Sequence, residues 1–232
     1  MITSKDNAKI KELAKLKTTK YRNQTKTFLV EGKHLVTEAR NANLLIEAFS
    51  LDDIDDYTQV SPEVMKKLSS TDTLVSEVAL CKMKDELPLS DKILILDSIQ
   101  DPGNLGTLLR SAKAFNFNTV ILGSGTVDLY NEKVIRSSQG AIFKLNIIKK
   151  DLISFIPTLT KYKVYGTNVR NGIDIKEVKN NKNIAVILGN EGNGISKEVD
   201  DLVNYNIYIK MDNMESLNVG VAGSIIMYEL NK

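Results

Sequence analysis

The stretch that decides the fold covers residues 92–112 and reads Lys92-Ile-Leu-Ile-Leu-Asp-Ser-Ile-Gln-Asp-Pro-Gly-Asn-Leu-Gly-Thr-Leu-Leu-Arg-Ser-Ala112. Residues 92–96 carry a nearly continuous apolar run, which is typical of a strand buried on both faces. Pro102 and Gly103 then predict a tight turn, and Asn104 is placed to cap a helix over residues 105–115. A buried strand that turns directly into a helix is the first unit of a sheet built from parallel strands.

The same alternation continues toward the C-terminus. We expect further strands at 119–122, 142–148, 163–166, 184–188 and 205–209, and helices at 132–139, 152–159, 195–202 and 219–230. The strands are apolar without alternation, which indicates an α/β fold with a mainly parallel sheet and helices on both faces. Ligands of such sheets bind beyond the carboxyl ends of the strands, so the loops at those ends form the candidate site.

A smaller α/β domain is expected before this sheet. Its helices are predicted at 7–17, 34–41 and 61–68, and its strands at 27–30 and 46–51. Residues 87–91 are mostly polar, contain Pro88, and are followed by a new apolar run. We therefore predict a boundary near residue 90, between one domain at 1–90 and another at 91–232.

Composition argues against several classes of protein. Hydrophobic residues make up 42% of the 232 and charged residues 26%, the values of an ordinary globular protein. The apolar runs are too short to cross a bilayer and the Lys-rich start does not resemble a signal peptide, so we expect a cytoplasmic location. The single cysteine, Cys81, cannot form an internal disulfide, and the single histidine, His34, leaves a metal site without its usual ligands. We expect no metal.

Positive charge gathers near the N-terminus, although the net charge of the chain is only +2. Residues 1–40 hold ten basic and four acidic side chains, and the basic ones include Lys9, Lys11, Lys15 and Arg22. Such a stripe suits attraction to a polyanion such as RNA. A solvated lysine face of a helix explains the charge equally well.

The loop and helix at 97–112 carry Asn104 and Arg110. The rest of this helix is mostly apolar or small, so we expect Arg110 to face a cleft or an anion. A surface arginine on an amphipathic helix is the alternative. Gly103 and Gly106 would also suit a phosphate-binding turn of a dinucleotide fold, but the full Gly-x-Gly-x-x-Gly pattern is absent.

Two later loops are rich in glycine and polar residues. After the strand at 184–188 the chain reads Gly189-Asn-Glu-Gly-Asn-Gly-Ile-Ser196. Its Glu191 would repel a phosphate, which favours a neutral or cationic ligand. The last helix opens with Glu215-Ser-Leu-Asn-Val-Gly-Val-Ala-Gly-Ser224, where Ser216 is a candidate cap. The alternative for the loop at 189–196 is a plain β–α turn. The alternative for the start of the last helix is a packing or dimer interface.

Together these three motifs resemble those of the SpoU (TrmH) family. Asn-x-Gly-x-x-x-Arg after a strand, Leu-Gly-Asn-Glu-Gly-x-Gly after a later strand and Glu-Ser-Leu-Asn-Val at the last helix follow the order of that family's signature motifs, over residues 92–232. The N-terminal part is similar to the family's substrate-binding domain, which resembles ribosomal protein L30e. That likeness depends on the Lys-rich first helix and on Phe28-Leu-Val-Glu-Gly32.

The resemblance implies a SPOUT fold with a C-terminal trefoil knot, a homodimer, and 2′-O-methylation of a ribose in structured RNA with S-adenosylmethionine as methyl donor. Ribosomal RNA is the expected substrate. A transfer RNA 2′-O-methyltransferase and a catalytically silent RNA-binding or ribosome-assembly protein of the same fold are the alternatives.

The resemblance also assigns roles to residues. Matched motif by motif, the cofactor would be bound by Thr167, Gly189, Ile209 and Leu217. Arg110 would be the catalytic residue, either as an electrostatic stabiliser of the attacking oxygen or as an activated base. The accompanying polar site residues would be Asn104, Glu191, Ser216 and Asn218.

One segment departs from the family pattern. Where many relatives have Ile-Pro-Met and a glycine-containing loop, this chain reads Ile209-Lys-Met-Asp-Asn-Met-Glu215. The loop lacks the proline and the glycine and is shorter, but it contains none of the candidate catalytic groups.

Overall fold

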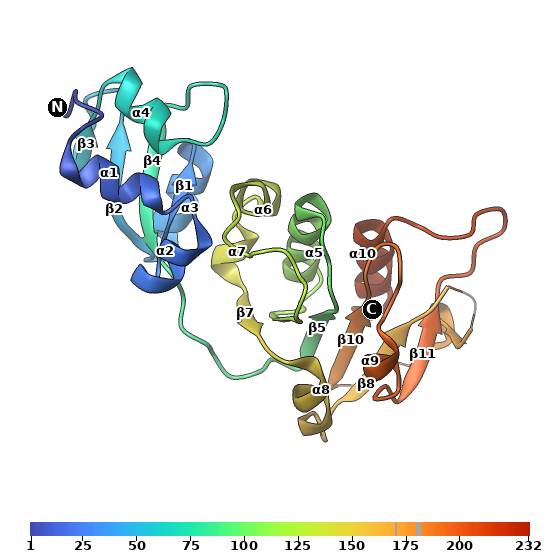
Figure 1. Cartoon of the computed structure of the whole chain (residues 1–232). Coiled ribbons are helices and arrows are strands. Elements are labelled where there is room, and N and C mark those ends of the chain that lie inside the picture. Colours follow the sequence, from blue (N-terminus) through green and yellow to red (C-terminus); the bar gives the residue numbers. More distant parts are fainter. Residues whose placement is uncertain (170, 180–181) are drawn as a thin grey trace. The chain divides into compact units, whose positions relative to one another are not determined.

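The computed structural model of the protein describes residues 1–169, 171–179 and 182–232, and Figure 1 labels its elements. The chain groups into two compact units. Residues 1–85 and 128–143 form the first unit, and residues 86–127 and 144–232 form the second. The chain therefore leaves the second unit after Val127 and returns to it at Lys144.

The first unit is built on a four-stranded sheet in the order β1-β4-β2-β3. Its elements within residues 1–85 are α1 (Ala8–Lys15), α2 (Thr19–Thr25), β1 (Thr27–Glu31), α3 (Lys33–Asn41), β2 (Leu45–Ser50), β3 (Tyr57–Gln59), α4 (Pro62–Leu68) and β4 (Glu77–Lys82). β4 pairs antiparallel with β1 and β2, and β3 pairs parallel with β2. Three of these elements, α2, β3 and β4, are not predicted from the sequence; α2 lacks helical apolar spacing and β3 is very short.

Residues 128–143 complete the core of the first unit, although they lie between two strands of the other unit in the sequence. They contain α6 (Glu132–Ser138). The rings of Tyr130 and Phe28 lie against each other with 4.5 Å between their centroids. The ring of Phe143 stacks on that of Phe28, with 6.4 Å between centroids. Aromatic packing therefore holds this segment in the first unit.

The second unit contains a seven-stranded sheet in the order β7-β6-β5-β10-β8-β11-β9, with every neighbouring pair parallel. Its strands are β5 (Lys92–Leu96), β6 (Thr119–Leu122), β7 (Asn146–Lys149), β8 (Lys163–Thr167), β9 (Ile173–Asp174), β10 (Ile184–Leu188) and β11 (Tyr205–Tyr208). The helical elements after them are α5 (Pro102–Ala114), α8 (Leu152–Phe155), η1 (Ile156–Thr158), η2 (Ile175–Glu177), α9 (Lys197–Asp200) and α10 (Val219–Glu229). The predicted α/β class with a mainly parallel sheet is confirmed.

The predicted strand at 142–148 is wrong at its start. The chain first forms the short helix α7 (Ala141–Lys144), and β7 begins only at Asn146. Ile142 and Phe143 are buried in that helix rather than in a strand. A short apolar run fits a buried helix as well as a buried strand, so periodicity could not distinguish the two.

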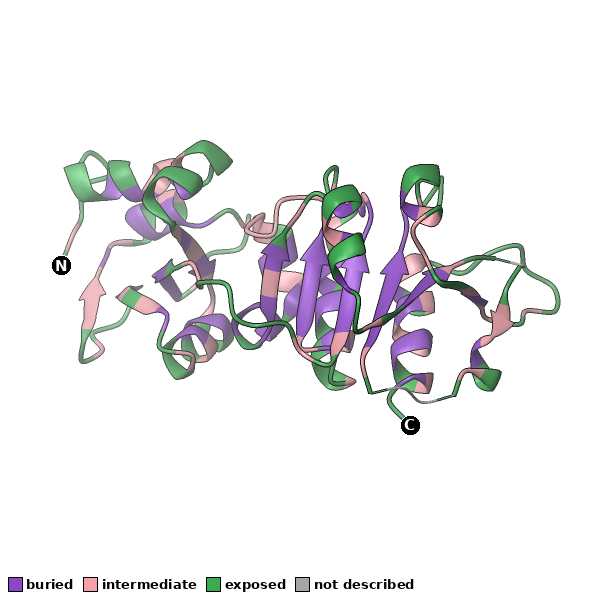
Figure 2. Ribbon diagram, turned by 90° about the horizontal axis from the view of Figure 1, so that it is seen from below, coloured by how far each residue is buried: buried purple, intermediate pink, exposed green. Residues whose placement is uncertain are grey.

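Helices cover both faces of the parallel sheet. On one face Ile95 and Ile187 pack with residues of α8, η1 and α9. On the other face Leu188 of β10 lies against α10. The central strands are buried along most of their length, as Figure 2 shows.

A glycine sets the distance between α10 and its neighbours. A side chain at Gly223 would collide with the side chains of Leu108 on α5 and Leu188 on β10. Next to it, Ser224 Oγ and Ser111 Oγ share a hydrogen bond of 2.7 Å. This close packing holds the first half of α10 against α5 and β10. It thereby also positions the third motif, which contains the start of α10.

We predict that Gly223→Val lowers the free energy of unfolding by about 1–3 kcal/mol, the usual cost of overpacking a buried contact. Val221→Ala, at a position of the same helix that is 47% exposed, is the control. It should change the free energy of unfolding by less than about 0.5 kcal/mol. Urea unfolding followed by circular dichroism measures both, and an equally small effect of the two changes would show that α10 does not pack tightly here.

Candidate active site

The loops at the carboxyl ends of β8, β10 and β11, together with the start of α10, enclose a cavity of about 750 Å³. All four residues predicted to bind the cofactor line it, namely Thr167, Gly189, Ile209 and Leu217. Of the predicted polar residues, Glu191, Ser216 and Asn218 line it as well, whereas Asn104 and Arg110 do not. The cavity lies at the edge of the sheet where ligands of parallel sheets bind.

The glycine-rich loop after β10 turns back on itself. Asn190 and Gly194 exchange two backbone hydrogen bonds of 2.9 Å, and Asn190 Oδ1 accepts from two amides inside the turn. Glycine is required at position 189, because a Cβ there would run into the backbone of Gly194 and Ile195. Asn190 organises this loop and was missed by the sequence analysis; an asparagine directly after a strand and a glycine is the signal of such a turn.

Glu191 connects this loop to the first motif. Its Oε1 accepts hydrogen bonds from the amide of Asp101 (3.1 Å) and from Asn104 Nδ2 (3.0 Å), and its Oε2 accepts from the amide of Gln100 (3.2 Å). Partial burial raises the pKa of Glu191, but the hydrogen bonds from Asn104 and these amides outweigh it and hold the pKa below its ordinary value. Glu191 is therefore ionised at neutral pH and joins two loops as an anion.

Asn104 extends this connection to the third motif, because its Oδ1 accepts from Asn218 Nδ2 at 2.9 Å. The helix caps predicted at Asn104 and Ser216 are wrong. Asp101 caps α5 by accepting from the amide of Asn104 at 2.7 Å, and Asn218 caps α10 by accepting from two amides of its first turn. A chain of hydrogen bonds from Glu191 through Asn104 to Asn218 thus joins all three motifs.

Arg110 stands apart from this chain of hydrogen bonds. It is exposed and lies about 9 Å along α5 from Asn104, at a rise of about 1.5 Å per residue. Its side chain makes no hydrogen bond or ion pair with any residue that the structure describes. Its five N–H donors are therefore available to a ligand.

Two other parts of the cavity lining, Thr167 and the segment at residues 210–217, are held to different degrees. Thr167 Oγ1 donates to the carbonyl of Ile187 at 2.9 Å and connects the ends of β8 and β10. Residues 210–217 make no hydrogen bond or ion pair with the described part of the chain. Met214 in this segment is 70% exposed. The loop that departs from the family pattern is thus the least restrained part of the site.

The cavity is lined by negative charge. Its described lining includes Glu191, Asp200 and Glu215 but no lysine or arginine. Such a lining attracts a cation and repels a phosphate. A nucleotide polyphosphate, the ligand of the dinucleotide-fold alternative, does not suit it.

Among the described residues, no group of histidine, cysteine and acidic side chains could hold a metal ion. None of the described helices is long and apolar enough to cross a membrane. Burial raises the pKa of the Cys81 thiol to about 12, which makes it a poor nucleophile.

The three lysines predicted to contact RNA lie on α1, where Lys9 and Lys11 are exposed and Lys15 is half-buried. Each of them forms an ion pair with a carboxylate. Lys9 pairs with Glu47 at 2.6 Å, Lys11 with Asp6 at 2.8 Å and Lys15 with Glu12 at 2.5 Å. Exposed pairs of this kind are weak, so a phosphate can replace the carboxylate.

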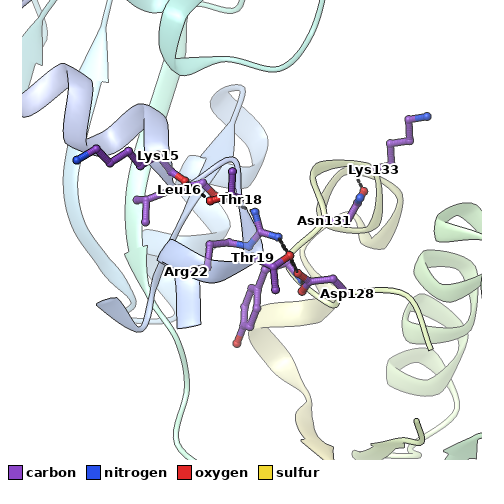
Figure 3. Close-up of polar contacts among 9 residues, drawn as sticks. Lys15, Leu16, Thr18, Thr19, Arg22, Asp128, Asn131 and Lys133 are labelled. Atoms are coloured by element: carbon purple, nitrogen blue, oxygen red, sulfur yellow. Dashed lines mark hydrogen bonds and ion pairs between the residues drawn. The ribbon is translucent and has the colours of Figure 1, made fainter. Parts of the chain in front are cut away.

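Arg22 differs from these lysines, as Figure 3 shows. It is only 5% exposed, and its Nη1 donates to the carbonyl of Leu16 at 2.8 Å. Its Nη2 donates to Thr19 Oγ1 at 2.9 Å and forms an ion pair of 2.6 Å with Asp128. Burial raises the pKa of Asp128, but the hydrogen bonds from Thr19 and Arg22 lower it overall. Arg22 thus has a structural role within the first unit, and its contact with RNA stays a prediction.

We predict that Glu191→Gln destabilises the protein at neutral pH but not in strong acid. Because the folded-state pKa lies below the unfolded value of about 4.3, the carboxylate stabilises the folded protein above pH 4.3, and this contribution is lost as the pH falls through the folded-state pKa. Urea unfolding at a series of pH values should show curves that differ at pH 7 and converge in acid. Glu198→Gln, an exposed change on α9, is the control. A difference between parent and Glu191→Gln that persists in strong acid would contradict this account.

Comparison with known proteins assigns both parts of the chain. The SpoU rRNA Methylase family matches residues 91–228, and the MRM3-like substrate binding domain matches residues 7–75. The 23S rRNA (guanosine(2553)-2′-O)-methyltransferase RlmP of Bacillus subtilis is 36% identical, over 99% of this chain and 98% of its own length.

Solved structures agree with this assignment. A protein of the TrmH family from Porphyromonas gingivalis superposes with a TM-score of 0.86 at 29% identity, covering 97% of both chains. The SpoU methyltransferase AviRb of Streptomyces viridochromogenes, solved with AdoMet, shares the fold with a TM-score of 0.85 at 21% identity, also over 97% of both chains. The predicted family is confirmed: this chain belongs to the SpoU rRNA methylase family.

Proposed function

We propose that this protein methylates a ribose 2′-hydroxyl of 23S ribosomal RNA and uses S-adenosylmethionine as the methyl donor. The observation that carries the proposal is the hydrogen-bonded chain Glu191–Asn104–Asn218, which gathers the three motifs of a methylase family beside one cavity. The substrate is proposed from the similarity to RlmP, whose name specifies 23S rRNA and which matches along its whole length. A ribosomal substrate implies a cytoplasmic location.

S-adenosylmethionine suits the cavity in size and charge. A volume of about 750 Å³ falls within the range of about 300–1,000 Å³ typical of small-molecule sites. The carboxylates of the lining favour a ligand with positive charge, and Gly189, which has no side chain, lets a ligand approach the backbone that lines the cavity. We propose that Thr167, Gly189, Ile209 and Leu217 contact it. When bound, S-adenosylmethionine supplies a methyl group on a positively charged sulfur.

Arg110 supplies positive charge where the reaction develops negative charge. A ribose hydroxyl is a poor nucleophile and must lose its proton as its oxygen attacks. Arginine keeps its own proton in proteins, so it is a poor base. We therefore assign Arg110 to stabilising the developing alkoxide and the neighbouring RNA phosphate, which can accept the proton.

The other polar residues predicted for the site have positioning roles in this proposal. Asn104 and Glu191 hold the loop from which α5 starts, and Asn218, with Ser216 nearby, holds the start of α10. Much of the rate then comes from keeping ribose, arginine and methyl donor in one arrangement.

Two further properties of the family are proposed for this chain. Arg110 does not line the cavity of its own chain, which supports a homodimer whose second copy completes the active site. The insertion of β10 between β5 and β8 supports a C-terminal trefoil knot.

We predict that Arg110→Ala lowers the rate of methyl transfer by about 100-fold or more, the usual loss when a preorganised oxyanion partner is removed. Binding of S-adenosylmethionine, measured by calorimetry, should not change. Lys113→Ala, which removes another cation from the same helix, is the matched control and should retain activity. The assay is transfer of tritiated methyl groups to unmodified 23S rRNA, followed by mapping of the 2′-O-methyl site.

The same assay tests the alternatives. Incorporation into transfer RNA alone would keep the chemistry and replace the substrate. A parent protein that binds RNA and transfers no methyl group to 23S or transfer RNA would favour the catalytically silent RNA-binding protein.

We predict that replacing Lys9, Lys11 and Lys15 together by alanine weakens RNA binding and flattens its salt dependence. The slope of log K against log salt should fall by about 0.7–0.9 for each RNA phosphate that the variant no longer neutralises. A matched triple change at exposed lysines of the second unit, Lys161, Lys163 and Lys182, should leave the slope as it is. An unchanged slope in the α1 variant would make these lysines a merely solvated face.

A further inference from the structure

We propose that Asp97 is a positioning residue of the cofactor site, which holds both ends of the glycine-rich loop against β5. The proposal rests on the proposed function, because it concerns binding of S-adenosylmethionine. Asp97 directly follows β5 and is only 7% exposed. It does not line the cavity itself and was not among the residues predicted for the site.

All the hydrogen bonds that the Asp97 carboxylate makes with the described residues come from one partner. Asp97 Oδ2 accepts from the amide of Ser196 and from Ser196 Oγ, each at 2.8 Å. No described lysine, arginine or histidine forms an ion pair with Asp97. A buried carboxylate without a cation is costly unless hydrogen bonds compensate for the lost water. The two donors of Ser196 are the ones that offset this cost.

The backbone of Asp97 contacts the opposite end of the same loop. The amide of Asp97 donates to the carbonyl of Leu188, the last residue of β10, at 2.9 Å. The loop thus leaves β10 beside the Asp97 backbone and reaches α9 beside the Asp97 carboxylate. Every residue from 189 to 195, between these two hydrogen-bonded points, lines the cavity.

Asp97 and Glu191 restrain different parts of this loop. Glu191 holds the middle of the loop to residues 100–104, and Asn190 holds the turn closed. Without the Asp97 carboxylate these bonds persist, so the loop keeps its turn, but Gly194 and Ile195 are no longer anchored through Ser196. A ligand would then have to order these residues on binding, which lowers its affinity.

Calorimetric titration of the full-length protein with S-adenosylmethionine tests the proposal. We expect Asp97→Ala to raise Kd by about 10- to 100-fold, the range of hydrogen bonds to a charged group. Asp97→Asn keeps an oxygen that can accept from Ser196 and should recover part of the affinity. Ser196→Ala removes one of the two donors and should raise Kd less than Asp97→Ala.

Asp151 offers a matched control within the same unit. Its Oδ2 accepts from the amide of Ser154 at 3.2 Å and from Ser154 Oγ at 2.7 Å, at the start of α8 and away from the cavity. Asp151→Ala should leave Kd at the parent value. Amide hydrogen exchange of residues 194–196 in the ligand-free protein gives a second readout, and it should become faster in Asp97→Ala but not in Asp151→Ala.

The outcomes separate this proposal from the proposed function. Folded Asp97→Ala and Ser196→Ala proteins with the parent Kd would overturn the role of Asp97 and leave the methyltransferase assignment intact. If Asp97→Ala does not fold, Ser196→Ala and Asp97→Asn decide, and unchanged affinity in both overturns the proposal. A parent protein that does not bind S-adenosylmethionine would instead reject the proposed function, and hydrogen exchange alone would then decide whether Asp97 holds the loop.

Discussion

The site depends on the position of β10 between β5 and β8. Neighbouring strands of a sheet lie about 4.8 Å apart, so the loops that follow β5 and β10 must meet. The hydrogen bonds of Asn104 with Glu191 and of Asp97 with Ser196 join residues 87 and 99 positions apart in the sequence. Strand order therefore creates the walls of the cavity, and side-chain hydrogen bonds hold them together.

The charges of the site are separated in a way that suits two different ligands. In the part of the chain that the structure describes, Glu191 and Asp97 both accept from backbone amides and neutral side chains rather than from a lysine or arginine. The carboxylates that line the cavity, those of Glu191, Asp200 and Glu215, make its wall negative, which suits a positively charged methyl donor. Arg110, by contrast, is exposed on α5 outside the cavity lining, where it can meet an RNA phosphate or alkoxide.

Burial also sets Arg22 apart from the other basic residues of the N-terminal region that are predicted to contact RNA. On sequence alone Arg22 is one of several basic residues in a polar segment. In the structure it is buried against Asp128, a residue more than a hundred positions away, in the segment that also packs Tyr130 on Phe28. The lysines of α1 keep their charged ends at the surface, because a flexible stem lets each one reach a carboxylate that is itself at least partly exposed.

The sequence by itself determined the strand–helix alternation of the second unit and the three motifs, because apolar periodicity and glycine or asparagine turns are local properties. The four cavity-lining residues predicted for the cofactor, Thr167, Gly189, Ile209 and Leu217, came from the resemblance of these motifs to those of the SpoU family. Tertiary structure alone decided the strand order, the helix at 141–144, the caps Asp101 and Asn218, and the partners of Arg22 and Asp97. Each of these depends on which distant group lies within about 3 Å of a polar atom or against an apolar side chain. The packing of the whole unit sets that distance, so it cannot be predicted from a local sequence pattern.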